Sequence, residues 1–200
     1  MHSHRFNSQK YISLVLLLGV TVYLFTLYGP LIIQAGISVD DWGDIAHNLD
    51  CGSFWHCYKT WFPLFSNRPL APLPITLLTF TLGTWYSGYL LINSLIYLLA
   101  IGLFARVIYF ITDSKTATIF LLFAAIPMIA MPVITSPINQ STATVSLLLW
   151  STSLITLLRF IQTEQAAFGL GAFGCLLLAF LTYEVILPLL VITALIPWIW

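Results

Sequence analysis

YLLINSLIYLLAIGLFARVIYFI, residues 89–111, is the stretch that decides the fold. It runs for 23 residues and carries a single charge, at Arg106. A helix needs about 20 mostly apolar residues to cross the hydrocarbon core of a bilayer, and it satisfies its own backbone hydrogen bonds there. The stretch therefore predicts a membrane-spanning helix.

The composition of the whole chain extends this prediction. Of its 200 residues, 60 % are hydrophobic and only 7 % are charged, and the mean hydropathy is +0.96. The net charge of zero excludes a basic nucleic-acid-binding surface. Strands are not expected, because the sequence lacks the alternating ten-residue segments of a membrane barrel. We expect an all-α, polytopic bundle that forms a single membrane domain over residues 1–200.

Apolar runs predict six spans, at residues 11–33, 89–111, 116–135, 142–160, 166–183 and 185–200. The first run is longer than the apolar core of a signal peptide and lacks a persuasive cleavage site. The last run stops at Trp200 without a charged flank. We therefore expect an incomplete sixth span, in a chain that is a fragment, the product of a truncated reading frame or one half of a split protein.

The distribution of basic residues orients this bundle. One side receives five of them, and the other receives only Lys59 and Arg68; the five are Arg5, Lys10, Arg106, Lys115 and Arg159. Because cytoplasmic loops are enriched in Lys and Arg, residues 1–10 are predicted to be cytoplasmic and residues 34–88 to form an outer loop. Glu184 falls on the outer side as well.

The outer loop contains an apolar segment, residues 69–82, that is too short to cross. Pro69, Pro72 and Pro74 also disfavour a regular crossing helix there. We expect an interfacial or re-entrant segment. The aromatic residues around the loop are expected at headgroup depth, in contact with membrane lipids; they are Trp42, Trp55, Trp61, Trp85 and Tyr86.

Acidic residues gather at the start of the outer loop, in SVDDWGDIAHNLD, residues 38–50. Four of the seven acidic residues of the chain lie here: Asp40, Asp41, Asp44 and Asp50. At the point where a helix leaves the bilayer, carboxylates stay hydrated and can meet a substrate. The alternative is that they solvate the loop and cap a helix.

A helix through this loop would place Asp40 and Asp44 on one face together with His47 or Asn48, and would point Asp40 and Asp41 apart. Such a carboxylate pair can divide its roles. One carboxylate could serve as general base for a weak hydroxyl nucleophile, while the other binds a divalent metal or holds the acceptor. No cofactor or metal site is otherwise predicted.

Two cysteines, Cys51 and Cys57, lie in the same loop. Outside the cytoplasm a disulfide between them is chemically allowed. A zinc site made from them together with His47 and His56 matches no strong zinc-binding spacing.

The order of these motifs resembles a known family. A first span is followed by an outer loop with an acidic pair (Asp40, Asp41), then by Asn67-Arg68-Pro69-Leu70, then by a span that carries Asn93. This order is similar to the N-terminal part of the GT-C superfamily of polytopic glycosyltransferases. Protein O-mannosyltransferases, aminoarabinose transferases and bacterial O-antigen glucosyltransferases are the members it most resembles.

The resemblance implies transfer of a sugar from a polyprenyl-phosphate carrier to a cell-envelope glycan, lipid or protein on the outer face, with inversion. Asp40 and Asp41 match the catalytic pair, with Asp40 favoured as the base. Arg68 and Lys59 would bind the phosphate, Asp44 would assist in substrate binding, and Glu184 would contact acceptor or carrier. The implied location is the bacterial inner membrane. The chain is shorter than the enzymes of this family, which puts complete activity in doubt.

Other readings remain open at this stage. A non-enzymatic membrane protein (half of a transporter, a flippase for a lipid carrier or an accessory subunit) and an inactive remnant share these features. Arg68 and Lys59 could simply lie among lipid headgroups, and Glu184 could extend to the interface. Asn93 favours hydrogen bonding between helices.

Overall fold

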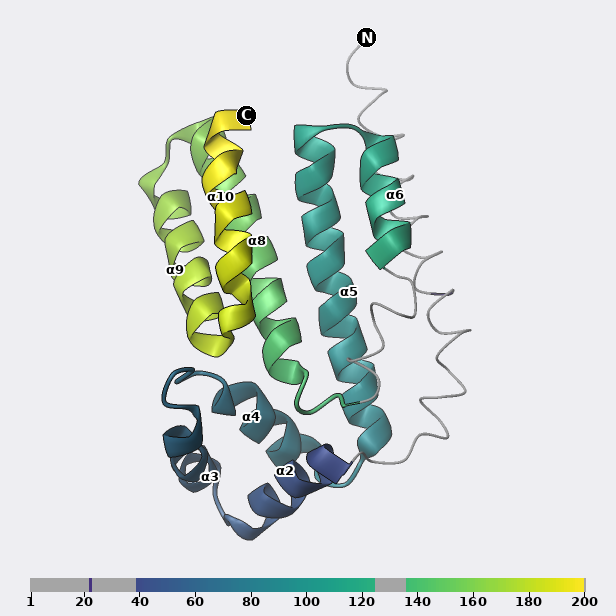
Figure 1. The fold of residues 1–200 in the computed structure, drawn as a ribbon, viewed down its shortest axis with the longest axis vertical. Coiled ribbons are helices and arrows are strands. Elements are labelled where there is room, and N and C mark those ends of the chain that lie inside the picture. The colour runs from purple at the N-terminus through teal and green to yellow at the C-terminus, as the bar shows by residue number, and fades with distance from the viewer. Residues whose placement is uncertain (1–21, 23–38, 125–135, 200) are drawn as a thin grey trace.

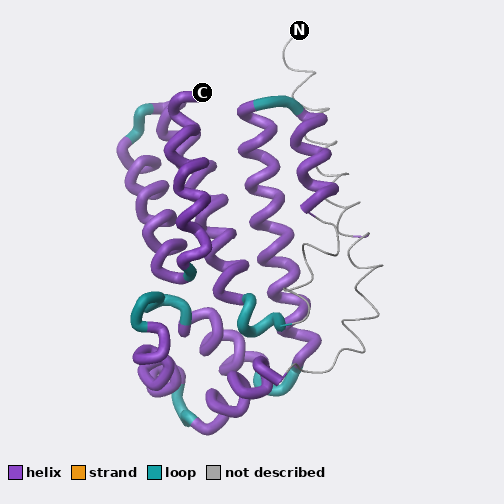
Figure 2. Tube along the Cα trace, viewed as in Figure 1, coloured by secondary structure: helices purple, strands orange, loops and turns teal. Residues whose placement is uncertain are grey.

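The computed structural model describes Val22, residues 39–124 and residues 136–199, and these residues form helices joined by short loops (Figure 2). In chain order the helices are α2 (Val39–Asp50), α3 (Phe54–Trp61), η1 (Phe62–Phe65), α4 (Pro72–Leu82), α5 (Tyr86–Ile111), α6 (Ser114–Ala124), α8 (Ser141–Thr163), α9 (Ala166–Thr182), η2 (Glu184–Ile186) and α10 (Leu187–Ile199). The described part contains no strand, so the prediction of an all-α fold is confirmed there.

Two of these helices are long and apolar enough to cross a membrane. They are α5, with 26 residues, and α8, with 23 residues. At about 1.5 Å per residue each exceeds the roughly 30 Å of a hydrocarbon core. The helices predicted at 89–111 and 142–160 are therefore present. Helix α5 begins earlier than predicted, and α8 extends beyond its predicted bounds at both ends.

The other predicted spans are described in part. The run at 166–183 forms α9, an apolar helix of 17 residues, and the run at 185–200 forms η2 and α10. Only the first half of the run at 116–135 is described, as α6. The run at 11–33 lies outside the described residues apart from Val22, and six spans therefore stay a prediction.

Helix α8 is the centre of the bundle, packed between α5 on one side and α9 on the other (Figure 1). Hydrogen bonds join the helices: Ser146 Oγ donates to Ala179 O at 2.6 Å, and Trp150 Nε1 donates to Thr193 Oγ1 at 2.9 Å. In a lipid environment such bonds and close packing replace the hydrophobic effect as the force between helices.

Helices α2, α3, η1 and α4 form a separate layer across one end of the bundle, which we call the end layer (Figure 1). Within it α2 and α3 both pack on α4. The side chains that join the layer to the bundle are buried and apolar; they are Ile45, Ile75, Leu78, Tyr89, Leu90 and Ile138. The outer loop thus forms a packed structure.

Helix α4 accounts for most of the predicted interfacial segment at 69–82. Pro72 and Pro74 lie in its first turn, where a helix needs no hydrogen bond from their nitrogen atoms. The helix ends at Gly83, whose φ of 54° favours glycine. Tyr89 in α5 donates its hydroxyl to Gly83 O at 2.5 Å, which fixes the corner between α4 and α5.

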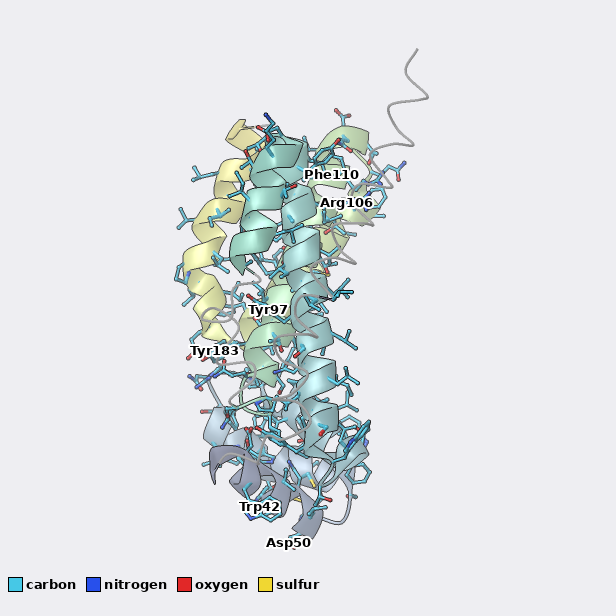
Figure 3. All side chains as sticks on the ribbon, turned by 90° about the vertical axis from the view of Figure 1, so that its right-hand side faces the viewer. Trp42, Asp50, Tyr97, Arg106, Phe110 and Tyr183 are labelled. Carbon is cyan, nitrogen blue, oxygen red and sulfur yellow. The ribbon has the colours of Figure 1, made fainter. Side chains whose placement is uncertain are left out.

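The described basic residues divide between the two ends of the molecule. Arg106 and Phe110 lie far from Trp42 and Asp50 of the end layer (Figure 3). The connections from α5 to α6 and from α8 to α9 share the far end (Figure 1), and the second of them contains Glu164, exposed and with φ 56°. That this far end faces the cytoplasm stays a prediction.

Candidate functional site

The acidic segment forms helix α2 as predicted, but the expectation that its carboxylates stay hydrated is wrong for Asp41 and Asp44. Asp41, Asp44, Ile45 and Asn48 are buried, whereas His47 is exposed. Their spacing of three and four residues is that of one helical face. The buried face therefore begins at Asp41, and His47 does not belong to it. The side chain of Asp40 lies outside the described part of the structure.

Asp41 is the most deeply placed charged residue of the end layer, with 0 % of its surface exposed. Its Oδ1 accepts a hydrogen bond from Ser136 Oγ at 2.8 Å and another from the backbone N–H of Asn139 at 3.2 Å. A buried carboxylate requires such donors, because it has lost its water. Asp41 therefore joins α2 to the loop that precedes α8.

The same loop, residues 136–140, is also bonded from the bundle. Asn93 in α5 is fully buried, and its Nδ2 donates to Pro137 O at 2.9 Å. The hydroxyl of Thr144 in α8 donates to Asn93 Oδ1. The prediction that Asn93 forms a hydrogen bond between helices is confirmed.

Two predicted substrate-binding residues, Arg68 and Glu184, lie together. Arg68 Nε is 2.9 Å from Glu184 Oε2, and both side chains are partly exposed. The guanidinium also lies over the rings of Tyr183, at 5.1 Å, and Phe65, at 5.7 Å. Leu70 N–H donates to Leu181 O at 3.0 Å, so the start of α4 is bonded to the end of α9.

Arg68 keeps part of its hydrogen-bonding capacity. Guanidinium carries five N–H donors, and the ion pair is made through Nε. Within the described ranges, its Nη atoms form no hydrogen bond, and the ion pair involves Nε alone. An arginine fixed by an ion pair and two rings, with free Nη donors, suits a bidentate anion such as a phosphate.

Lys59 and Asp44, the other predicted substrate-binding residues, are placed differently. Lys59 is exposed on α3 and forms no ion pair within the part of the chain that is described. Asp44 is 8 % exposed on the buried face of α2. The role of both residues in substrate binding stays a prediction.

Cys51 and Cys57 are both free thiols, and they lie next to each other. Cys51 Sγ donates to His47 O at 3.1 Å, and Cys57 Sγ donates to Asn48 O at 3.5 Å. Burial and the neighbouring Cys51 raise the pKa of Cys57 from 9.0 to about 11. The disulfide stays a prediction.

No group of three or more His, Cys, Asp or Glu side chains in the described ranges could hold a metal ion. His47 serves instead in packing: its ring lies against Trp61 with centroids 4.5 Å apart, and its Nε2 is 3.0 Å from Thr60 Oγ1. Thr60 donates its own hydroxyl hydrogen to Cys57 O at 2.7 Å, so the imidazole Nε2 is the donor to Thr60.

The aromatic residues of the outer loop separate into two groups. Trp42, Trp55 and Trp85 are exposed, as residues at headgroup depth would be. Trp61 is half-buried and donates Nε1–H to Asn48 Oδ1 at 3.0 Å, and Tyr86 is buried. Tyr86 therefore packs inside the protein and not against lipid, whereas the headgroup depth of the aromatic residues stays a prediction.

Comparisons of the chain with models of known protein families, with curated proteins and with solved structures found no match. The site must therefore be interpreted from its own geometry.

Sequence reasoning missed the partners of the two predicted acids. Ser136 and Asn139 were not predicted as partners of Asp41, although the polar SPINQ segment between two apolar runs was a signal for them. The partner of Glu184 was missed as well: Arg68 lies over the ring of the adjacent Tyr183, and no pattern in the sequence indicated this contact.

Proposed function

We propose that the chain is a membrane glycosyltransferase of the GT-C type, which moves a sugar from a polyprenyl-phosphate donor to a cell-envelope acceptor. The observation that carries this proposal is the position of Arg68. It is fixed by Glu184, Tyr183 and Phe65 at the junction of the end layer and the bundle. At that depth a lipid-borne phosphate would lie beside it.

The ion pair is compatible with this role. Glu184 Oε2 lies 2.9 Å from Nε in an ion pair without a hydrogen bond, so it holds the guanidinium by charge, while the Nη donors remain for phosphate oxygens. Lys59, exposed on the neighbouring α3, would add a second positive charge. Both cations stabilise the negative charge that develops on the phosphate as the bond to the sugar breaks.

Asp40 is the proposed general base. It lies in the first turn of α2, one position before the buried Asp41. A sugar or protein hydroxyl is a weak nucleophile, so attack on the anomeric carbon requires that its proton be accepted as the bond forms. Attack from the face opposite the phosphate inverts the configuration. No metal is needed for this step.

We place the protein in the bacterial inner membrane, with six spans, a cytoplasmic N-terminus and the end layer on the outer side. The exposed Trp42, Trp55 and Trp85 support contact of this layer with lipid headgroups. The division of basic residues between the ends supports the orientation.

The test is sugar transfer by the full chain in proteoliposomes, with a radiolabelled polyprenyl-phosphate hexose and a glycolipid extract as acceptor. Asp40→Asn should lower kcat by about a thousandfold, because the base is lost while the shape is kept. Asp50→Asn, at the exposed end of the same helix, should leave the rate unchanged. Equal rates for wild type and Asp40→Asn would overturn the assignment, and absence of transfer by the wild type would favour a non-enzymatic membrane protein.

A further inference from the structure

Besides the contacts of Arg68 and Leu70 with the end of α9 and with η2, a second group of polar contacts between the end layer and the bundle meets at the loop of residues 136–140. Asp41 accepts two hydrogen bonds from it on the side of the layer, and Asn93 donates one to it on the side of the bundle. Thr144 completes the chain of bonds into α8. The loop is thus bonded to α2, α5 and α8 together.

We propose that Asp41 is a positioning residue, which sets the place of α2 and thereby of Asp40 against the bundle, and that it takes no direct part in proton transfer. This proposal rests on the proposed function for its consequence in catalysis. Its structural part, that Asp41 holds α2 on the bundle, does not depend on that function.

Burial and connectivity distinguish this role from that of a base. A general base must reach the acceptor hydroxyl, and Asp41 has no exposed surface. Its Oδ1 receives the hydroxyl of Ser136 and the backbone N–H of Asn139, from a segment 95 to 98 residues further along the chain. Charge-assisted bonds of this kind are stronger than neutral ones.

The neighbouring surface of α2 provides a natural reporter. Cys57 in α3 is fully buried, and its thiol is bonded to the backbone of Asn48 in α2. If α2 separates from the bundle, Cys57 becomes accessible to thiol reagents. The chain has three cysteines, so replacing Cys51 and Cys175 with serine leaves Cys57 as the single thiol.

The first measurement is the rate of maleimide labelling of Cys57 in this single-thiol protein. Asp41→Ala should raise the rate about tenfold, since it removes the acceptor of two buried hydrogen bonds. Ser136→Ala should raise it about threefold, because one bond remains. Asp41→Asn retains an oxygen acceptor and should change the labelling rate little. Asp50→Asn should leave the labelling rate unchanged.

The second measurement is the kinetics of sugar transfer by the same variants. If Asp41 is a positioning residue, Asp41→Ala lowers kcat more than Ser136→Ala does, just as it raises the labelling rate more. The change in KM is smaller than the change in kcat, and Asp41→Asn keeps most of the wild-type rate. For a base, Asp41→Asn would be as inactive as Asp41→Ala, and Ser136→Ala would be nearly normal.

The outcomes separate the two proposals. Unchanged labelling in both Asp41→Ala and Ser136→Ala overturns the positioning role, whatever the activity. Increased labelling in a protein without transfer activity supports the positioning of α2 and overturns the glycosyltransferase. Should Asp41→Ala fail to fold, Ser136→Ala and Asp41→Asn still decide the question.

Discussion

The bundle and the end layer differ in the charge of the buried polar side chains that join their elements. In the bundle, the buried polar side chains that join helices are neutral: Tyr97 donates to Ala124 O, Ser146 to Ala179 O and Asn93 to Pro137 O. In the end layer, the corresponding group is the carboxylate of Asp41. Burying a carboxylate costs far more than burying an amide or a hydroxyl. In the proposed function, the layer carries the chemistry and the buried carboxylate of Asp41 holds α2 in place for it.

Among the substitutions that test this difference between the end layer and the bundle, the largest effect is expected at Arg68. Arg68→Ala should lower kcat/KM for the polyprenyl-phosphate donor by about a hundredfold, as expected for the loss of charge-assisted hydrogen bonds to a phosphate. Arg68→Lys should recover only part of the lost kcat/KM, because an ammonium lacks the planar guanidinium geometry that binds a phosphate through two hydrogen bonds. The measurement is the donor concentration dependence of transfer in proteoliposomes.

The matched control is Arg159→Ala, an exposed arginine near the far end of the bundle. It should leave kcat/KM unchanged. Equal losses at Arg68 and Arg159 would mean that overall positive charge, and not a site in the end layer, attracts the donor.

A smaller effect is expected at Gly83, where the layer joins the bundle. A Cβ at this position meets nothing within 4 Å, so Gly83→Ala tests backbone strain alone. With φ at 54° and ψ at −116°, the alanine should lower the free energy of unfolding by about 1–3 kcal/mol. Unfolding in mixed detergent and SDS micelles measures it.

Gly174 offers the comparison in the bundle. It lies inside α9, and a Cβ there also meets nothing within 4 Å. Gly174→Ala should leave stability unchanged or raise it slightly, since alanine is the better helix former. A loss at Gly174 as large as at Gly83 would contradict the assignment to strain.

The smallest effect is expected inside the bundle, at Asn93. Asn93→Val should lower the free energy of unfolding by about 1 kcal/mol, the usual size of a hydrogen bond between membrane helices. Ser94→Ala, the half-buried neighbour, should have no such effect. A similar loss in both variants would show that the change does not depend on the bond to Pro137.

The sequence was sufficient to predict the elements that depend on local composition. The apolar runs predicted the ends of α5, α8 and α9 to within three residues, because a long, mostly apolar stretch has few alternatives to a helix. The helix at the acidic loop followed from spacing in the same way. Helix α4, of 11 residues, is short as predicted, and Pro72 and Pro74 lie in its first turn, where proline is tolerated.

The candidate site depended on contacts distant in the sequence, and there local patterns were insufficient. Arg68 and Glu184 were each selected separately, and nothing in their neighbourhoods indicated that they pair. Equally, the burial of Asp41 depends on Ser136 and Asn139. A helical pattern shows which residues share a face, but the direction of that face is set by the partner that covers it.

The turn at Glu164 has a practical consequence. It is exposed, lies at the end opposite the acidic helix and already adopts a left-handed backbone conformation. Exposed turns of this kind accept inserted domains. A green fluorescent protein inserted after Glu164 should leave the rest of the molecule intact, and because that domain matures when it folds in the cytoplasm, its brightness in living cells would reveal which way the molecule crosses the membrane.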